Sequence, residues 1–368
     1  MPDKKPPRRP EWTPDNAGEE FATRVMKGVR RKEHTQGVSP ARRRELSVDD
    51  YVDGVLRGDS AILARVITLI ESNASHHIDI GQEVLQHLSA HRCGSIRVGI
   101  TGVPGAGKST FIEALGLDLI RAGHRLAVLA VDPSSSRTRG SILGDKTRME
   151  LLSRERDCFI RPSPSGGELG GVTRKTRETI ALCEAADYDV ILVETVGVGQ
   201  NEITVRSMVD FFLLLKIAGA GDELQAIKKG VVELADAVVI NKADGANREA
   251  ALLARSEFER ALHYLAPATP GWRTPSLVCS AHEHTGIDEI WEMITRFRRL
   301  TDESGEFERR RRQQAKQWMH AMLRNELTRA FYQDETVKTR LAGCEREVEE
   351  GKKPVTQAVR ELLELYRH

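Results

Sequence analysis

The stretch from Gly102 to Ser109 constrains the fold of this chain more than any other segment. It reads Gly-Val-Pro-Gly-Ala-Gly-Lys-Ser and matches the phosphate-loop pattern Gly-x-x-x-x-Gly-Lys-Ser at every defined position. An apolar run at 96–100 precedes it, as expected of a buried strand, and apolar residues recur at helical spacing over 109–122. A strand, a glycine-rich loop and a helix in this order predict an α/β fold.

The chemistry of this loop suits a nucleoside triphosphate. Glycines allow backbone N–H groups to close around phosphate oxygens, because a Cβ at those points would block the approach. We expect Lys108 to reach the terminal phosphates and the Ser109 hydroxyl to bind Mg²⁺ at the helix N-terminus. The alternative, a glycine-rich turn that binds nothing, is disfavoured by the Lys-Ser pair and by the flanking elements. The residues expected at the nucleotide are Gly102, Val103, Pro104, Gly105, Ala106, Gly107, Lys108, Ser109 and Thr110.

A second motif indicates the base. The apolar run 237–240 leads directly into Asn241-Lys242-Ala243-Asp244, the Asn-Lys-x-Asp guanine reader of GTP-binding proteins. The Asp244 carboxylate can accept hydrogen bonds from the guanine N1–H and exocyclic amine, whereas adenine would leave that carboxylate unpaired. We expect Asn241 to tie this loop to the phosphate loop and Lys242 to lie over the base. The nucleotide is therefore predicted to be GTP or GDP, not ATP.

A third segment agrees with this interpretation. The run 276–279 ends in Ser280-Ala281-His282, where GTPases place a backbone contact to the guanine oxygen. The three residues are therefore predicted to border the base.

Acidic residues follow two further predicted strands. Glu194 ends the run 190–193, where an acid beside the phosphate loop is placed to hold Mg²⁺. Its alternative role is an N-cap for the next helix. Gly197 can offer its N–H to the γ-phosphate, and Asp132 and Asp145 belong to a polar loop suited to Mg²⁺ and to sensing the nucleotide. The predicted catalytic set is Lys108, Asp132, Asp145 and Glu194, and the predicted metal ligands are Ser109, Asp132, Asp145 and Glu194.

The order of apolar and amphipathic segments defines the predicted architecture. A mobile charged arm at 1–46, with one short helix over 20–29, precedes a helical segment at 47–93. In that segment a polar break over 73–77 separates two of the helices. The region 94–302 alternates strands with helices, which predicts a mainly parallel sheet flanked by helices. Its predicted strands are 96–100, 125–131, 158–161, 189–194, 211–217, 237–241 and 276–280.

The region 303–368 is predicted to be wholly helical, with breaks near Gly343 and over 351–354. Apolar residues recur at helical spacing from Trp318 to Leu327, which in a monomer would be core of the globular body. The arginines at 309–312 are expected on a solvated helix face.

Composition excludes several classes of partner. The 368 residues carry 55 Lys plus Arg against 54 Asp plus Glu, so no overall field favours nucleic acid or a membrane surface. No apolar stretch is long enough to cross a bilayer, and no secretory signal precedes the fold. The five cysteines are scattered without a Cys-x-x-Cys pair, which favours reduced thiols and a cytoplasmic location.

Several motifs together show a family resemblance. The chain resembles the MeaB/ArgK GTPases, the family of the human protein MMAA, from about Leu46 to the C-terminal helices. Besides the phosphate loop, the motifs are Val131-Asp132-Pro133-Ser134-Ser135, Gly144-Asp145-Lys146-Thr147-Arg148-Met149, Glu194-Thr195-Val196-Gly197-Val198-Gly199-Gln200 and Gly219-Ala220-Gly221-Asp222-Glu223-Leu224-Gln225. The charged N-terminal arm departs from the family pattern, which leaves the role of residues 1–46 open.

The resemblance implies a function. It implies a Mg²⁺-dependent GTPase that acts as chaperone of adenosylcobalamin-dependent methylmalonyl-CoA mutase or a close relative. Such a chaperone gates cobalamin loading and protects or reactivates the mutase. The resemblance also implies Mg²⁺ carboxylates at Asp132, Asp145 and Glu194, and a C-terminal dimerisation arm that makes a homodimer. Two alternatives stay open: a GTPase that inserts a metal into another enzyme, and a GTP-binding module that does not cycle.

Overall fold

A parallel β-sheet forms the centre of the computed structural model, which describes residues 46–72, 74–91, 93–131, 149–162, 169–195, 202–219 and 229–367. The seven strands run in the order β3-β2-β4-β1-β5-β6-β7, and every neighbouring pair is parallel. Each strand lies within two residues of its predicted bounds. The strands are β1 (Ile96–Gly102), β2 (Leu126–Val131), β3 (Cys158–Arg161), β4 (Val190–Thr195), β5 (Phe211–Ile217), β6 (Ala237–Asn241) and β7 (Ser276–Val278).

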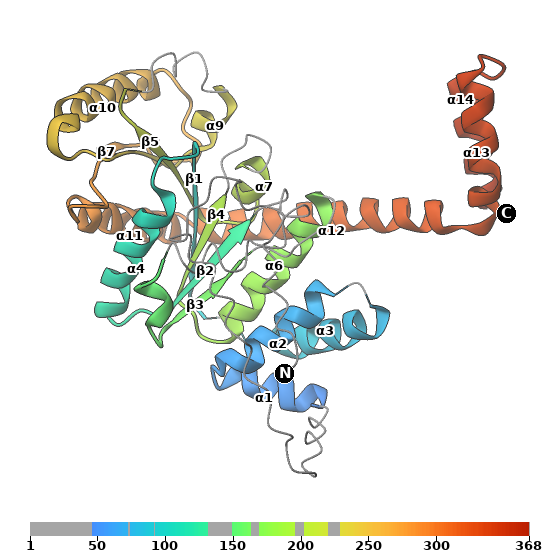
Figure 1. The fold of residues 1–368 in the computed structure, drawn as a ribbon, viewed down its shortest axis with the longest axis horizontal. Coiled ribbons are helices and arrows are strands. Elements are labelled where there is room, and N and C mark those ends of the chain that lie inside the picture. The colour runs from blue at the N-terminus through green and yellow to red at the C-terminus, as the bar shows by residue number, and fades with distance from the viewer. Residues whose placement is uncertain are drawn as a thin grey trace, which may run out of the picture. The chain divides into compact units, whose positions relative to one another are not determined.

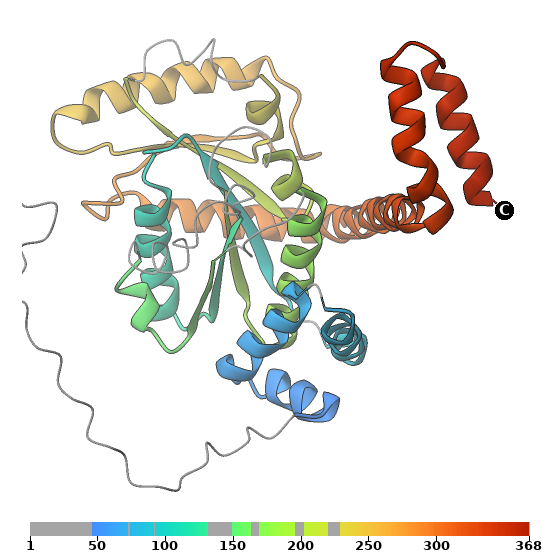
Figure 2. The same cartoon turned by 45° about the vertical axis from the view of Figure 1, so that its right-hand side comes forward.

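Helices cover both faces of the sheet, which explains why the strands are continuous apolar runs. On one face, α4 (Lys108–Arg121) and α11 (Ile287–Glu303) pack against β1, β4 and β5 around Phe111, Ile294 and Phe297. On the other, α6 (Leu169–Ala185) and α7 (Glu202–Arg206) pack around Ile180 and Val205. The two layers are visible in Figures 1 and 2. Beside β6, α9 (Lys229–Leu234) and α10 (Arg248–His263) close a smaller cluster.

Three N-terminal helices extend the α6 side of the core. They are α1 (Val48–Leu56), α2 (Ser60–Glu71) and α3 (Ser75–Leu88), and their apolar faces join the cluster under α6. The predicted break between the second and third helices is confirmed but ends before His77, because α2 ends at Glu71 and α3 already begins at Ser75. Ser72 stabilises this short connection, since its Oγ accepts the Ala74 N–H at 3.2 Å. The predicted arm and its helix over 20–29 lie outside the described residues.

The C-terminal region is helical, as predicted, but one of its two breaks lies elsewhere. α12 (Glu306–Gln333) is followed by α13 (Glu335–Glu349), which runs straight through Gly343. The break falls at Asp334, whose Oδ1 caps α13 by accepting the Thr336 and Val337 N–H groups at 2.9 and 3.1 Å. A helix tolerates one interior glycine at a cost of about 1 kcal/mol, whereas a capped aspartate starts a new one.

The second predicted break is confirmed. Gly351 has φ of +68° and Pro354 precedes α14 (Val355–Arg367), which packs along α13 as a helical hairpin (Figure 2). Two single 3₁₀ turns, Leu152–Arg154 and Gly245–Asn247, complete the described elements.

Candidate nucleotide site

The phosphate loop joins β1 to α4 at the carboxyl edge of the sheet. Two of its glycines are required by space. A Cβ on Gly102 would lie 2.2 Å from the Leu215 carbonyl oxygen, and one on Gly107 would lie 2.7 Å from Asn241 Nδ2. Gly107 also has φ of +85°, a conformation that other residues rarely adopt. These glycines let the loop close tightly over its neighbours and turn its amides toward a bound phosphate.

Lys108 is held inside this loop. Its side chain is buried, and Nζ donates to the carbonyl oxygens of Gly102 at 2.9 Å and Val103 at 3.3 Å. The ammonium is therefore held at the loop by two backbone carbonyl oxygens, and phosphate oxygens can take their place as hydrogen-bond acceptors. A group this buried is a fixed part of the loop, not an exposed side chain.

Ser109 and Glu194 are brought together by the sheet. β4 lies beside β1 with Ile100 opposite Glu194, so the acid reaches the first turn of α4. Ser109 Oγ donates to Glu194 Oε1 at 3.1 Å. A hydroxyl and a carboxylate at this separation are the oxygen donors that Mg²⁺ prefers, and both face the phosphate loop. The donor pair therefore fits a hard divalent cation.

Asn241 joins three loops. This side chain is fully buried at the end of β6, where Nδ2 donates to the Ala106 carbonyl at 2.9 Å. Its Oδ1 accepts the Ala281 N–H at 3.1 Å. One amide thus fixes the phosphate loop, the loop after β6 and the loop after β7 relative to one another.

The base-reading residues converge at the same edge. Ser280 Oγ donates to Asp244 Oδ2 at 2.5 Å, which orients that carboxylate, and Lys242 takes a left-handed conformation with φ of +59°. Asn247 Nδ2 donates to the Lys242 carbonyl at 2.8 Å and supports this turn. His282 is exposed beside them. Of the predicted site residues, Asp132, Asp145 and Gly197 lie outside the described part of the chain.

Sequence reasoning missed a buried charge network at the opposite edge of the sheet. The prediction that arginines 309–312 form a solvated face is wrong for two of them, since the side chains of Arg310 and Arg311 are only 11 % and 15 % exposed. Arg311 donates to both carboxylate oxygens of Asp210, at 2.8 and 2.6 Å. Arg310 lies 3.6 Å from Asp236. The sequence did offer one signal of these ion pairs, because an acid stands directly before each of the strands β5 and β6.

This network sets the ionisation of its acids. Burial alone would raise the pKa of Asp210, but the hydrogen bonds and charge of Arg311, with Arg97, hold that pKa below its ordinary value. The ion pair thereby anchors α12 to the start of β5, the strand next to β6. Gln314, one turn further along α12, donates to the Val209 carbonyl at 2.8 Å.

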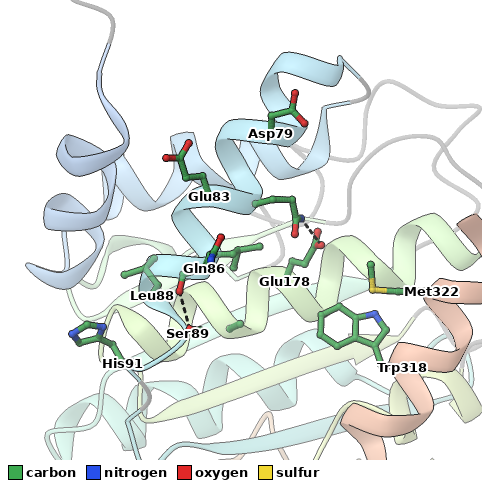
Figure 3. Close-up of a pocket in the computed structure, with 12 residues that line it drawn as sticks. Asp79, Glu83, Gln86, Leu88, Ser89, His91, Glu178, Trp318 and Met322 are labelled. Atoms are coloured by element: carbon green, nitrogen blue, oxygen red, sulfur yellow. Dashed lines mark hydrogen bonds between the residues drawn. The ribbon is translucent and has the colours of Figure 1, made fainter.

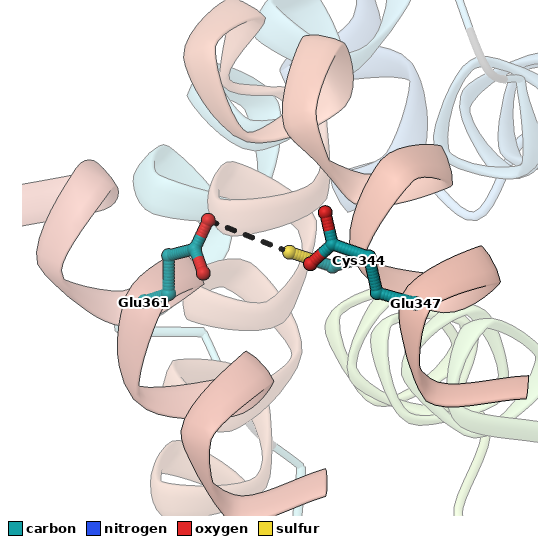
Figure 4. Close-up of side chains that lie close together, drawn as sticks. All are labelled: Cys344, Glu347 and Glu361. Atoms are coloured by element: carbon teal, nitrogen blue, oxygen red, sulfur yellow. Dashed lines mark hydrogen bonds between the residues drawn. The ribbon is translucent and has the colours of Figure 1, made fainter. Parts of the chain in front are cut away.

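A cluster elsewhere has the spacing of a metal site but not its chemistry. Ligand atoms of Cys344, Glu347 and Glu361 lie within 4.8 Å of one another (Figure 4). However, Arg340 donates to Glu347 at 2.9 Å and to Glu361 at 2.6 Å, and Lys353 contacts both carboxylates. Lys353 and Arg340 lower the pKa of Glu361 to about 2. The cluster is an ion-pair network that joins α13 to α14.

The fold and site together define a class. A phosphate loop between β1 and α4, with an Asn-Lys-x-Asp loop after β6 on the far side of β5, belongs to a GTP-binding protein of the P-loop class. Within the described residues, no helix combines the length and apolar character needed to cross a membrane.

Comparison with known proteins identifies the family. The sequence model described as "Methylmalonyl Co-A mutase-associated GTPase MeaB" matches residues 63–336, so the chain belongs to this family of GTPases. It is 50% identical over 321 residues to a probable GTPase of Mycobacterium tuberculosis, covering 86% of this chain and 96% of that protein. It is 47% identical over 291 residues to GTPase ArgK of Escherichia coli, covering 79% and 88%.

A mammalian relative and a solved structure agree. The mouse "methylmalonic aciduria type A homolog, mitochondrial" is 42% identical over 346 residues, covering 91% of this chain and 83% of that protein. The crystal structure of an "LAO/AO transport system kinase" superposes with a TM-score of 0.70 at 37% identity, covering 87% of this chain and 98% of that one. The chain is therefore a GTPase that binds guanine nucleotides.

Proposed function

We propose that this GTPase is the chaperone of an adenosylcobalamin-dependent acyl-CoA mutase of the methylmalonyl-CoA mutase type. In this role it gates cobalamin loading and protects or reactivates the mutase. The observation that carries the proposal is the family match over residues 63–336, whose description names association with that mutase. The name of the mouse relative, which refers to methylmalonic aciduria, is in keeping with it.

In the proposed cycle, Lys108 neutralises charge on the terminal phosphates and Asp244 selects guanine. Mg²⁺, when bound, would be held by Ser109 and Glu194, with Asp132 and Asp145 as further predicted ligands, and would neutralise developing phosphate charge. Asn241 holds the phosphate loop against the base loops. Binding of the base and of the phosphates is coupled through this one amide.

We also propose that the chain forms a homodimer through its C-terminal helices. Met319, Leu323 and Leu327 recur every four residues on α12 and are 51%, 53% and 62% exposed. They do not belong to the core of this single chain, so the dimer arm is the favoured alternative. Val355, Val359 and Leu363 form a second exposed row on α14. Exposed apolar rows of this kind mark an interaction surface.

The dimer is tested by sedimentation of the full chain. Leu323→Glu should shift the population toward monomer, whereas Leu253→Glu, at a similarly exposed leucine on α10, should leave it unchanged. A monomeric wild-type chain at micromolar concentration would refute the homodimer.

The mutase role is tested with purified proteins. The chain is mixed with adenosylcobalamin-dependent methylmalonyl-CoA mutase in the presence of GDP or a non-hydrolysable GTP analogue, and complex formation and cobalamin transfer are measured. A nucleotide-dependent complex is expected, and absence of any complex in either state would refute the role. Metal insertion is the less favoured alternative, because in the described part of the chain the carboxylates of the Cys344 cluster are already paired with basic side chains.

A further inference from the structure

A pocket of about 570 Å³ lies between α3, α6 and α12, apart from every residue of the nucleotide site (Figure 3). This volume lies within the range of small-molecule sites. The residues that line it are Asp79, Gln82, Glu83, Leu85, Gln86, Leu88, Ser89, His91, Glu178, Ala181, Trp318 and Met322. The pocket therefore brings together three helices that are far apart in sequence.

Glu178 gives this pocket a buried carboxylate with spare hydrogen-bonding capacity. The residue is only 3% exposed, and its Oε1 accepts a hydrogen bond from Gln82 Nε2 at 2.8 Å. Its Oε2 is buried and accepts no hydrogen bond from the part of the chain that the structure describes. Arg174 Nε forms an ion pair with that oxygen at 3.8 Å, a distance outside hydrogen-bond range. A buried acceptor left in this state is costly.

Trp318 supplies a hydrogen-bond donor to the same pocket. Its Nε1–H is also buried and has no acceptor among the described residues. An indole N–H normally finds a partner when buried. One unpaired acceptor and one unpaired donor thus border the same pocket, and an occupant that carries both complementary groups would satisfy them.

The remaining lining determines the charge of that occupant. Among the described residues that line it, Asp79 and Glu83 add two carboxylates to that of Glu178, and none is a lysine or an arginine. Leu85, Leu88 and Met322 add apolar side chains to the lining. Aromatic faces and carboxylates together favour a cation, and the Arg177 guanidinium already lies 5.7 Å from the centroid of the Trp318 ring.

We propose that this pocket binds a small organic cation, a protonated amine or guanidinium on an apolar stem that also carries an oxygen acceptor. The cationic group pairs with Glu178, the stem lies against Trp318 and Met322, and the oxygen accepts the Trp318 N–H. The proposal goes beyond the proposed mutase role, and the pocket shares no residue with the nucleotide site.

The test uses tyramine and dopamine, two protonated amines whose stems carry hydroxyl oxygens, as cationic probes and 4-ethylphenol as the neutral counterpart of tyramine. Calorimetric titration of the full-length chain should show one saturable site for at least one amine and at least tenfold weaker binding of 4-ethylphenol. Glu178→Gln should weaken the amine at least tenfold. Glu303→Gln, which removes an exposed carboxylate of α11 outside the pocket, should not.

Two further variants keep the test decisive if Glu178→Gln fails to fold. Met322→Arg places a tethered cation on the pocket wall and should block the amine while GDP affinity is retained. Trp318→Phe should weaken tyramine but leave phenethylamine, which lacks the hydroxyl, unchanged. Absence of saturable binding of both amines, equal affinity for 4-ethylphenol, or unchanged affinity in Met322→Arg would overturn the proposal.

Discussion

The Asn241 side chain donates a 2.9 Å hydrogen bond to the Ala106 carbonyl, so the loop that reads the base holds the loop that binds the phosphates. The same amide accepts the Ala281 N–H through its oxygen. Both hydrogen bonds are buried, so water cannot reach these groups to replace a lost partner. Loss of this one side chain should therefore affect binding of the whole nucleotide.

We predict that Asn241→Ala lowers GTP and GDP affinity at least tenfold and destabilises the chain by about 2 kcal/mol. The substitution leaves a buried carbonyl and a buried N–H unpaired. Fluorescent-nucleotide titration and urea unfolding measure the two effects. The matched control is Asn325→Ala, which removes an exposed amide on α12, outside the nucleotide site. Equal losses in the two variants would contradict the coupling role.

Lys108→Ala should reduce GTP turnover by at least about a hundredfold, because a charge placed at the terminal phosphates is lost. The buried Nζ also holds the carbonyls of Gly102 and Val103, so a small loss of stability is expected besides. Circular dichroism should still show a folded chain. Wild-type turnover in the purified variant would disprove the assignment of Lys108.

Asp244→Asn should weaken GTP, because an amide then faces the guanine N1–H and amine donors. Xanthosine triphosphate carries a carbonyl acceptor where guanine has its amine, so the variant should shift preference toward it. Competition of the two nucleotides against labelled GDP gives the ratio directly. An unchanged ratio would show that Asp244 does not contact the base.

The sequence predicted the seven strands because most of them are apolar runs buried between two layers of helices, a local signal. It also predicted residues that the structure brings together around the phosphate loop, among them Ser109, Glu194 and Asn241, whereas their contact with a nucleotide stays a prediction. It did not predict that helix α13 continues through Gly343, because capping by Asp334 outweighs one glycine. Nor did it predict the burial of Arg310 and Arg311, because their partners Asp236 and Asp210 are far away in sequence, the latter by 101 residues.

Acid should destabilise the contact between Arg311 and Asp210. The folded-state pKa of Asp210 lies below the ordinary value of about 4, so the pair contributes its full stability above that pH. This contribution is lost as the pH falls from about 4 through the folded-state pKa. Unfolding free energies measured between pH 7 and pH 3 should therefore fall more steeply in the wild type than in Arg311→Met.

Arg311→Met should also cost about 3 kcal/mol at pH 7, because it leaves the Asp210 carboxylate buried without its main partner. Arg312→Met, at the exposed neighbouring arginine, serves as the control and should change neither quantity. Parallel pH profiles in all three proteins would show that Asp210 does not control acid stability.

Finally, we predict slow GTP hydrolysis by the isolated chain and faster hydrolysis with its mutase. Ras-like GTPases place a glutamine directly after the switch glycine, but here Val198 follows Gly197, and a valine cannot orient the attacking water. The water must be positioned by other groups, and the charged loop around Arg137 and Arg148 offers candidates. Both arginines lie outside the described residues, and we expect the bound mutase to bring the catalytic groups into place.

Single-turnover hydrolysis of GTP, measured alone and at saturating methylmalonyl-CoA mutase, tests this prediction. The rate should rise in the complex, and Lys108→Ala should remain inactive in both conditions, because the partner orders the site without replacing its lysine. Equal rates with and without saturating mutase would show that this partner does not control hydrolysis.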